Sequence, residues 1–268
     1  MGLAVCATPI GNLDDVTLRV LAELREADVV LCEDTRRTAI LLDRHGIRAR
    51  SLLSYHRHNE AHRIAELLPR LAAGERIALV SDAGLPAIND PGTRLVDAAL
   101  DVGADVTVLP GASAIETALV ASGLASAEYR FLGYLPRGAA ALEALWDELS
   151  AWPHASVAFE SSRRLPATLA SLAAADQERR LAVCRELTKR FEEVVRGPAH
   201  ALAARFREPP KGEVTLVIGP SSAGGDGTEA ALEAVLELVA AGAPRRVAVD
   251  VVSRLTGSPR NALYRRSL

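Results

Sequence analysis

Short apolar runs alternate with longer amphipathic stretches along the first half of the chain. Runs of four to six mostly apolar residues bounded by turn-forming residues predict buried strands, and apolar residues repeating every three to four positions predict helices. The strands are expected at Leu3–Thr8, Asp28–Cys32, Ile77–Val80 and Asp105–Leu109. The helices are expected at 18–24, with Leu18, Leu21 and Leu24 on one face, at 60–73 and 93–102, and after residue 113. Strands alternating with helices indicate right-handed βαβ units on a parallel sheet.

The second half repeats the alternation less regularly, after a glycine- and alanine-rich stretch at 137–141. Helices are expected at 141–150 and 165–174, and strands at 155–159, 180–184, 191–196 and 212–218. Residues 221–227 have the composition of a flexible linker, and the pattern beyond them predicts helices only. We therefore expect an N-terminal α/β domain over 1–136, a second α/β domain over 137–220 and a basic helical extension over 228–268.

Composition narrows the class of protein but does not name it. The chain has 268 residues, 49% hydrophobic and 24% charged, as expected for a globular protein with a large core. A net charge of −3 excludes a globally basic nucleic-acid binder, so such a site would have to be a local patch. Three widely spaced cysteines form neither a metal-binding motif nor a disulfide framework. The chain lacks a signal-peptide pattern and an apolar run of membrane-spanning length, so we expect a cytoplasmic location.

Four polar loops follow strands of the predicted parallel sheet. Because ligands of such sheets bind beyond the carboxyl ends of the strands, these loops are expected to share one crevice. They are Pro9–Asp15, Glu33–Thr38, Ser81–Pro91 and Pro110–Ser113. In the central loop Asp82 is a hydrogen-bond acceptor among small residues. The alternative is that Asp82 or Asp90 caps the next helix.

Two clusters carry more polar chemistry than turns require. Glu33–Thr38 holds two acids, two arginines and two threonines, although Asp34 or Thr35 could simply cap a helix. Tyr55–Asn59 offers stacking, cationic and hydrogen-bonding groups, although a solvated loop would fit too. Two histidines two residues apart have no further ligand nearby in sequence, so no metal site is predicted. These residues indicate a group-transfer or binding site for a polar molecule and do not identify that molecule.

A set of motifs resembles the bacterial ribosomal RNA small-subunit methyltransferase I family. The motifs occur in the family's order from residue 3 to about 218, and the basic helical tail resembles the family's C-terminal extension. They are Ala7-Thr-Pro-Ile-Gly-Asn-Leu-Asp-Asp15, Glu33-Asp-Thr-Arg36, Ser54-Tyr-His56 with Asn59, Ser81-Asp-Ala-Gly84, Asp90-Pro-Gly92, Pro110-Gly111 with Ser113, and Glu186-Leu-Thr-Lys189. The resemblance implies a two-domain α/β fold of the tetrapyrrole-methylase-like class (class III methyltransferases), with a parallel-sheet N-terminal domain, a mixed α/β second domain and a small helical C-terminal extension.

The same resemblance implies the activity, the cofactor and the partners. The reaction would be 2′-O-methylation of a cytidine ribose in the decoding region of 16S rRNA, with S-adenosylmethionine as methyl donor and no metal. The partners would be 16S rRNA or the small ribosomal subunit and a second copy of the chain, and no membrane is expected.

The resemblance also implies which residues form the site. The cofactor-binding residues would be Ile10, Gly11, Asp82, Ala83, Gly84, Leu85, Ser113, Ala114, Phe159, Glu160 and Glu186. A ribose hydroxyl is a poor nucleophile, so a positioned base is expected, and Glu33, Asp34 and His56 are the candidates. Arg36 could hold the adjacent phosphate. Two positions depart from the family pattern, because Leu85 stands in place of a threonine and Ser162 in place of a proline.

Two other functions remain open at this point. A methyltransferase of the same fold could act on a tetrapyrrole or another small acceptor, and a non-catalytic nucleotide- or RNA-binding module could keep the fold. The clusters at Glu33–Arg37 and Tyr55–Asn59 suit RNA better than a macrocycle. The arginines of the C-terminal region are expected to contribute to RNA affinity, or else to be solvated on a packed helical unit: Arg245, Arg246, Arg254, Arg260, Arg265 and Arg266.

Overall fold

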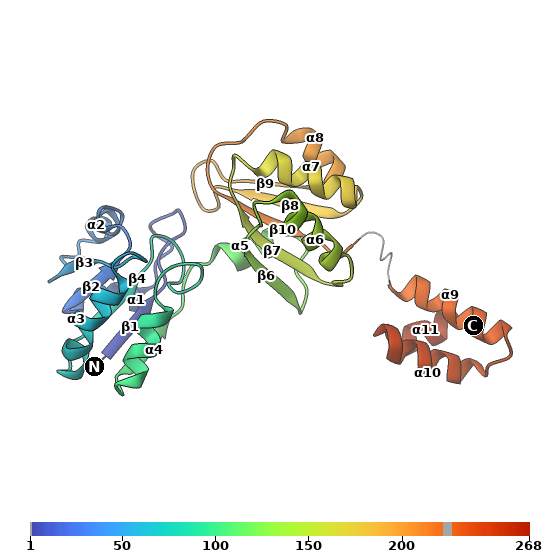
Figure 1. Cartoon of the computed structure of the whole chain (residues 1–268), viewed down its shortest axis with the longest axis horizontal. Helices are drawn as coiled ribbons and strands as arrows, with labels where there is room; N and C mark the ends of the chain where they lie inside the picture. The colour runs from blue at the N-terminus through green and yellow to red at the C-terminus, as the bar shows by residue number, and fades with distance from the viewer. Residues whose placement is uncertain (1, 222–226) are drawn as a thin grey trace.

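The computed structural model describes residues 2–221 and 227–268. Two α/β units and a small helical unit follow one another along the chain (Figure 1). Within the described ranges no helix is long and apolar enough to cross a membrane. The linker predicted over 221–227 falls mainly on residues 222–226, which lie outside the described residues.

The first unit is a five-stranded sheet in the order β3-β2-β4-β1-β5, parallel throughout as predicted. Its strands are β1 Gly2–Cys6, β2 Val29–Cys32, β3 Leu52–Ser54, β4 Ile77–Val80 and β5 Asp105–Leu109. β1, β2 and β4 are buried except for Gly2, because helices cover both faces of the sheet. β3 was not predicted, since three residues form too short a pattern.

Four helices cover this sheet: α1 Leu18–Glu26, α2 Thr35–Arg44, α3 Glu60–Ala72 and α4 Thr93–Asp101. Residues of α1 and α2 pack on one face of the sheet, and residues of α3 and α4 pack on the other. The buried face of α1 consists of Val20, Leu21 and Leu24, whereas Leu18 is 84% exposed. The expectation that Leu18 lies on the buried face was wrong. α1 begins at Leu18, with Thr17 as N-cap, and its first buried residue is Val20, two positions later.

The second unit is a mixed sheet in the order β6-β7-β10-β8-β9. β6 and β7 are parallel and the other neighbours are antiparallel, as expected for a mixed α/β domain. The strands are β6 Tyr129–Tyr134, β7 Ala155–Glu160, β8 Arg180–Arg185, β9 Glu193–Pro198 and β10 Val214–Ile218.

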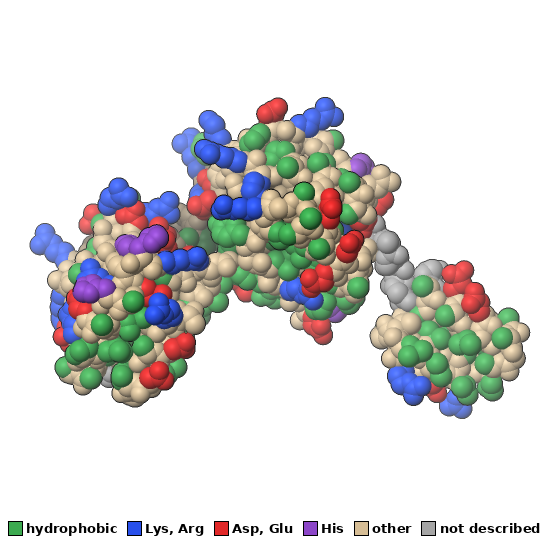
Figure 2. Space-filling view, viewed as in Figure 1, with side chains coloured by type: hydrophobic (Ala, Val, Ile, Leu, Met, Phe, Trp, Pro, Cys, Tyr) green, Lys and Arg blue, Asp and Glu red, His purple; other side chains and the backbone are tan. Residues whose placement is uncertain are grey.

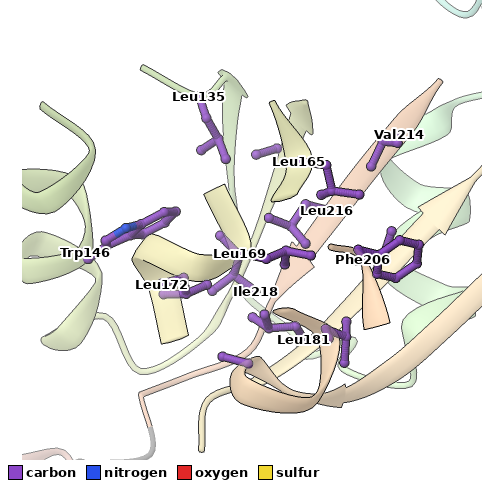
Figure 3. Packing of buried hydrophobic residues seen from close by; sticks show 14 of the residues in the cluster. Leu135, Trp146, Leu165, Leu169, Leu172, Leu181, Phe206, Val214, Leu216 and Ile218 are labelled. Carbon is purple, nitrogen blue, oxygen red and sulfur yellow. The ribbon is translucent and has the colours of Figure 1, made fainter. Parts of the chain in front are cut away.

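Helices cover both faces of the second sheet too. On one face Trp146, Leu169 and Phe206 point into a single apolar cluster (Figure 3). They come from α6 Ala139–Ser150, α7 Leu165–Ala175 and the end of α8 Ala199–Arg205, a helix that the sequence pattern did not predict. On the other face lies α5 Ala114–Ser122, through Ile115, Ala118 and Leu119. Both α5 and β6 therefore lie with the second sheet, before the boundary that we predicted at residue 136.

The C-terminal unit consists of helices only, as predicted: α9 Gly227–Ala240, α10 Arg245–Thr256 and α11 Arg260–Arg266. It has an apolar cluster of its own, in which Val235, Val249 and Leu263 are completely buried. A unit with its own core is expected to fold around that core.

Candidate functional site

The loops that follow β1 and β4 are joined by backbone hydrogen bonds. The Thr8 amide donates to the Gly84 carbonyl at 2.8 Å, and the Gly84 amide donates back at 3.0 Å. Gly84 has φ 79°, a conformation that glycine adopts without strain. A Cβ added to Gly84 would lie 3.8 Å from both Ile10 Cγ2 and the Ala112 carbonyl oxygen. Gly84 therefore lies where the loops after β1, β4 and β5 converge, as predicted from the ends of parallel strands.

Asp82 joins the loop after β4 to the loop after β2. Its Oδ1 accepts the Asp34 amide at 3.1 Å, and its Oδ2 lies 3.4 Å from Arg37 Nη1. The carboxylate thus has protein partners already, which makes it a positioning group for the Glu33–Arg37 loop. Ala83, next to it, is exposed, and Leu85 packs on the apolar cluster around Leu79 and Leu95.

Asp34 is the N-cap of α2. Its Oδ1 accepts the Arg36 amide at 2.9 Å, and the Arg36 guanidinium donates to both carboxylate oxygens, at 3.1 and 2.7 Å. These bonds lower the pKa of Asp34 to about 2. The capping interpretation is confirmed, and a carboxylate of such low pKa is a poor general base at neutral pH. The side chain of Arg36 is 88% exposed and accessible to a ligand.

Asp90 is the site acid that the sequence argument missed, although it stood in a quoted motif. Burial, and then the negative charges of Glu33 and Asp82, raise the pKa of Asp90 to about 6 against the opposing effect of Arg57. Glu33 is exposed at the end of β2. The only signal in the sequence was an acid in a turn, which does not distinguish a cap from a buried acid beside like charges.

The Tyr55–Asn59 loop lies against the loop that carries Asp90. Arg57 Nη2 donates to the Asn89 carbonyl at 3.1 Å, and Asn89 has φ 64°. Positive φ in a non-glycine residue costs free energy, which indicates a loop shaped by its surroundings. The buried Nδ1 of His56 has no hydrogen-bond partner among the described residues.

Tyr55 does not offer its ring to a ligand, contrary to expectation. It is 1% exposed and packs in the core of the first unit. Its hydroxyl donates to Glu60 Oε1 at 2.7 Å. Within the loop, Asn59 Oδ1 accepts the His56 amide at 2.8 Å, which fixes the backbone beside the histidine.

The loop after β1 packs against the second unit. Ile10 is buried in an apolar cluster with Val157, Leu187 and Val217 of the second unit. A Cβ on Gly11 would lie 2.5 Å from Lys189 Cγ and 2.8 Å from the Leu187 carbonyl oxygen, so only glycine fits there. The Asn12 amide donates to Thr188 Oγ1 at 3.0 Å. The loop after β1 is therefore held firmly against the second unit.

The two acids assigned to the second unit are occupied by protein partners. Glu160 is 3% exposed, and its oxygens accept from the Ser161 amide at 2.6 Å, Arg164 at 2.9 Å and Thr168 at 2.6 Å. Glu186 pairs with Lys189 at 2.9 Å and accepts the Glu213 amide at 2.9 Å. The backbone bond from Glu213 is the main cause that lowers the pKa of Glu186. Their carboxylates hold loops in place and are not free to bind a ligand.

Aromatic side chains lie at the end of β6 and β7. The Phe159 ring packs edge-on against Phe131 at 5.2 Å and against Tyr134 at 5.6 Å between centroids. Tyr134 is 67% exposed, and burial and then the charges of Glu213 and Asp90 raise its pKa. Tyr134 therefore lies within reach of the charge of Asp90 in the first unit, and sequence reasoning had not selected it.

Ser113 is the N-cap of α5, and its hydroxyl donates to Glu116. Ala114 packs on the same apolar cluster as Ile10. These residues place the N-terminus of α5, whose free amides favour negative or polar groups, beside the convergent loops.

The arrangement suits a cationic small molecule with polar ends. Three carboxylates gather at one side, and a positive ligand there would relieve the repulsion that raises the pKa of Asp90. A sulfonium cofactor has this charge, and the α5 N-terminus offers hydrogen bonds to its polar groups. Figure 2 shows Arg and His side chains on several sides of the first unit, some of them next to the second unit and interspersed with acidic side chains.

Two other features bear on the choice of site. In residues 2–221 and 227–268, no group of three or more His, Cys, Asp and Glu is arranged to hold a metal ion. A cavity of about 740 Å³ between α1 and the strands β1 and β5 contains none of the predicted site residues. Its acids Glu23 and Glu26 are already paired with Arg76.

Two family models match the chain. The model described as "Tetrapyrrole (Corrin/Porphyrin) Methylases" matches residues 2–203, and the one described as "RsmI C-terminal HTH domain" matches residues 226–268.

Similar proteins are found among curated sequences. The ribosomal RNA small subunit methyltransferase I of Mesorhizobium japonicum is 44% identical, over 99% of this chain and 91% of its own length. That of Micromonospora olivasterospora is 44% identical, over 98% of this chain and 85% of its own length. That of Thermotoga maritima is 41% identical, over 81% of this chain and 97% of its own length.

Solved structures share the fold. A uroporphyrin-III C-methyltransferase from Thermus thermophilus, in complex with S-adenosylhomocysteine, matches with a TM-score of 0.56 at 17% identity, over 82% of this chain and 97% of its own. A diphthine synthase matches with a TM-score of 0.64 at 15% identity, over 82% of this chain and 90% of its own. These findings confirm the fold class, the enzyme class and the family expected from the motifs. The chain belongs to the ribosomal RNA small subunit methyltransferase I family.

Proposed function

We propose that the protein transfers the methyl group of S-adenosylmethionine to the 2′-hydroxyl of a cytidine in the decoding region of 16S rRNA. The observation that carries the proposal is the convergence at Gly84. Three loops of the parallel sheet meet there, with the acids Glu33, Asp82 and Asp90 on one side and the second unit on the other. The family resemblance supplies the identity of the acceptor.

The cofactor would be held mainly by backbone and by shape. Ala83 is exposed in the loop after β4, and Ile10 with Ala114 provides an apolar surface. The sulfonium group supplies an activated methyl group together with its own leaving group. Alignment of acceptor and donor can contribute up to roughly 7–11 kcal/mol to such a transfer.

Asp90 is our candidate for the general base. A carboxylate with a pKa of about 6 is mostly ionised at pH 7 and is a stronger base than an ordinary aspartate. Glu33 raises that pKa through its charge, and His56 presents an unpartnered ring nitrogen to the same group of loops. Asp34 is better explained as the residue that holds Arg36.

The cationic edge of the site favours RNA over a tetrapyrrole or another small acceptor. The side chains of Arg36 and Arg37 are 88% and 60% exposed, and Arg57 is exposed beside Asn89. Guanidinium groups bind phosphate oxygens in a bidentate manner, and phosphate contacts position a nucleic acid without reading its sequence.

We also propose that the protein is a cytoplasmic homodimer. β5 is an edge strand of the first sheet, and Val108 on it is 53% exposed. Leu100 and Val102, at the end of α4, which packs against β5, are 56% and 47% exposed. An exposed apolar patch beside an open sheet edge is typical of a protein–protein interface. Sedimentation at micromolar concentration should give twice the 28.4 kDa chain mass, and Val108→Glu should give the monomer.

Two measurements test the catalytic proposal. Calorimetry should detect binding of S-adenosylmethionine, and labelled methyl should then pass to unmodified small ribosomal subunits. Binding without transfer would favour a non-catalytic module, and transfer to a porphyrinoid alone would favour the small-acceptor alternative. Naked 16S rRNA tested beside assembled subunits would identify the true substrate.

A further inference from the structure

The arginines of the C-terminal unit lie on α10 and α11, where Asp250 is the acid beside them. Glu233 and Glu237 lie on α9. Figure 2 shows acidic side chains on the α9 side of this unit and Lys or Arg side chains on the opposite side. A small unit with one cationic side has the electrostatic footprint of a nucleic-acid contact, even in a chain of net negative charge.

A pocket of about 520 Å³ lies on that cationic side. It is lined by five residues of α10 and α11: Arg246, Arg260, Asn261, Tyr264 and Arg265. The four from α11 are spaced i, i+1, i+4 and i+5, so they share one face of the helix. Leu263, on the other side of α11, is completely buried in the unit's core and fixes the rotation of the helix.

Neighbouring groups hold two of the three arginines in place. Arg260 donates to Asp250 of α10; this hydrogen bond, and then the charges of Arg260 and Arg246, lower the pKa of Asp250. Arg265 donates to the Asn261 carbonyl at 3.2 Å. Within the described residues Arg246 makes no hydrogen bond or ion pair, and it attracts Asp250 only at longer range. The pocket therefore keeps cationic groups facing outward with one acid to balance them.

The lining matches the parts of a ribonucleotide. Arginines bind phosphate oxygens, a tyrosine ring stacks on a base of any sequence, and an asparagine amide both donates and accepts at a base edge or a 2′-hydroxyl. An acidic protein segment would use the arginines but would leave the stacking ring and the amide without a role.

One relative indicates that such a site would be accessory to catalysis. The alignment with the Thermotoga maritima protein spans 97% of that protein but 81% of this chain, which is about the share occupied by the two α/β units. An accessory unit is expected to change how firmly the substrate binds and not how fast the methyl group moves.

We propose that the α10–α11 pocket binds an RNA segment outside the catalytic cleft, with phosphates on Arg246 and Arg265 and a base on Tyr264. This inference rests on the proposed function, because the RNA is the rRNA substrate. It adds a second contact site, on a unit that carries none of the cofactor-binding residues.

The test compares two full-length variants that each lose positive charge from the helical unit. Arg246→Ala combined with Arg265→Ala removes two pocket guanidiniums, and Arg254→Ala removes an exposed arginine of α10 that does not line the pocket. RNA affinity is measured for unmodified 16S rRNA across a salt series. For single strands each phosphate contact contributes about 0.7 to the slope of log K against log salt, so the double variant should lose about 1.4. Arg254→Ala, outside the pocket, should change the slope by clearly less than the ~0.7 of one phosphate contact.

Kinetics and a second pair of variants complete the test. The double variant should raise KM for RNA severalfold at unchanged kcat and unchanged affinity for S-adenosylmethionine. Tyr264→Leu should weaken RNA binding about tenfold, whereas Tyr264→Phe keeps the ring and should not. Circular dichroism and thermal unfolding of each variant confirm folding.

The outcomes separate this inference from the proposed function. If the double variant and Arg254→Ala behave alike, the pocket is not a site and the inference is wrong. Suppose that polyglutamate competes with RNA for the wild type but not for the double variant, and that Tyr264→Leu binds RNA as the wild type does. The pocket then binds an acidic protein segment instead of RNA, and the inference is wrong. If wild-type protein neither binds rRNA nor methylates it, the proposed function itself fails.

Discussion

Both α/β units carry acids at the ends of strands or in the loops that follow strands, yet the carboxylates of the two units have different surroundings. In the second unit Glu160 is surrounded by donors from Ser161, Arg164 and Thr168. In the first unit Asp90 lies beside Glu33 and Asp82, which are also negative. A buried acid with complete partners stabilises a fold, whereas one beside like charges has a raised pKa suited to proton transfer. The number of donors around a carboxylate, rather than its place in a motif, indicates its role.

The largest expected effect of breaking this contrast is on catalysis. Asp90→Asn removes the base but keeps the shape of the side chain, so kcat for methyl transfer should fall about 10²–10⁴-fold.

The same substitution, Asp90→Asn, should increase the free energy of unfolding. Because the pKa of Asp90 is raised in the folded protein, the ionised carboxylate opposes folding progressively as pH rises from about 4 through about 6. At pH 7 the variant should therefore unfold at higher denaturant concentration than wild type. Unchanged kcat would remove Asp90 from the mechanism.

At Glu160 a substitution is expected to lower stability and to leave activity unchanged. Glu160→Ala leaves the buried Thr168 hydroxyl without its acceptor, whereas the partly buried Arg164 keeps the Leu135 and Pro136 carbonyls, so the loss should be about 1–3 kcal/mol of unfolding free energy. Urea denaturation followed by circular dichroism measures this loss. Activity of the remaining folded protein should stay near that of the wild type. A stable but inactive variant would make Glu160 a functional residue and overturn the contrast.

A smaller effect is expected where the two units touch. Gly11→Ala forces a methyl group against Lys189 Cγ and the Leu187 carbonyl, and overpacking of this kind costs about 1–3 kcal/mol. The displaced loop carries Ile10, so affinity for S-adenosylmethionine should fall as well, measured by calorimetry. Gly138→Ala is the matched control, since nothing lies within 4 Å of a Cβ at that position and its φ is −83°. Equal behaviour of the two variants would mean that the loop tolerates the shift.

The sequence predicted the framework of the fold better than it predicted the roles of residues. β4 and β5 were placed at their observed bounds because apolar runs and turn residues are local signals. β3, β6 and α8 were missed: β3 is very short, and β6 carries a bulge with a glycine of positive φ.

Roles were harder to predict, because partners come from distant parts of the chain. Asp34 was correctly considered as a cap, since its partner Arg36 is two residues away. The burial of Tyr55 depends on the core beneath its loop, and the raised pKa of Asp90 depends on Glu33 and Asp82 from other loops. No pattern within a few residues carries that information.

The pH dependence of kcat/KM for RNA tests the central contrast most directly, because it reports the pKa values of essential groups in the free enzyme. For the wild type, kcat/KM should rise tenfold per pH unit below about pH 6 and level off above it, following ionisation of Asp90. The residual activity of Asp90→Asn should lack this step. If Asp90→Asn keeps the same step at the same pH, another group is the base, and the acids of the first unit are structural like those of the second.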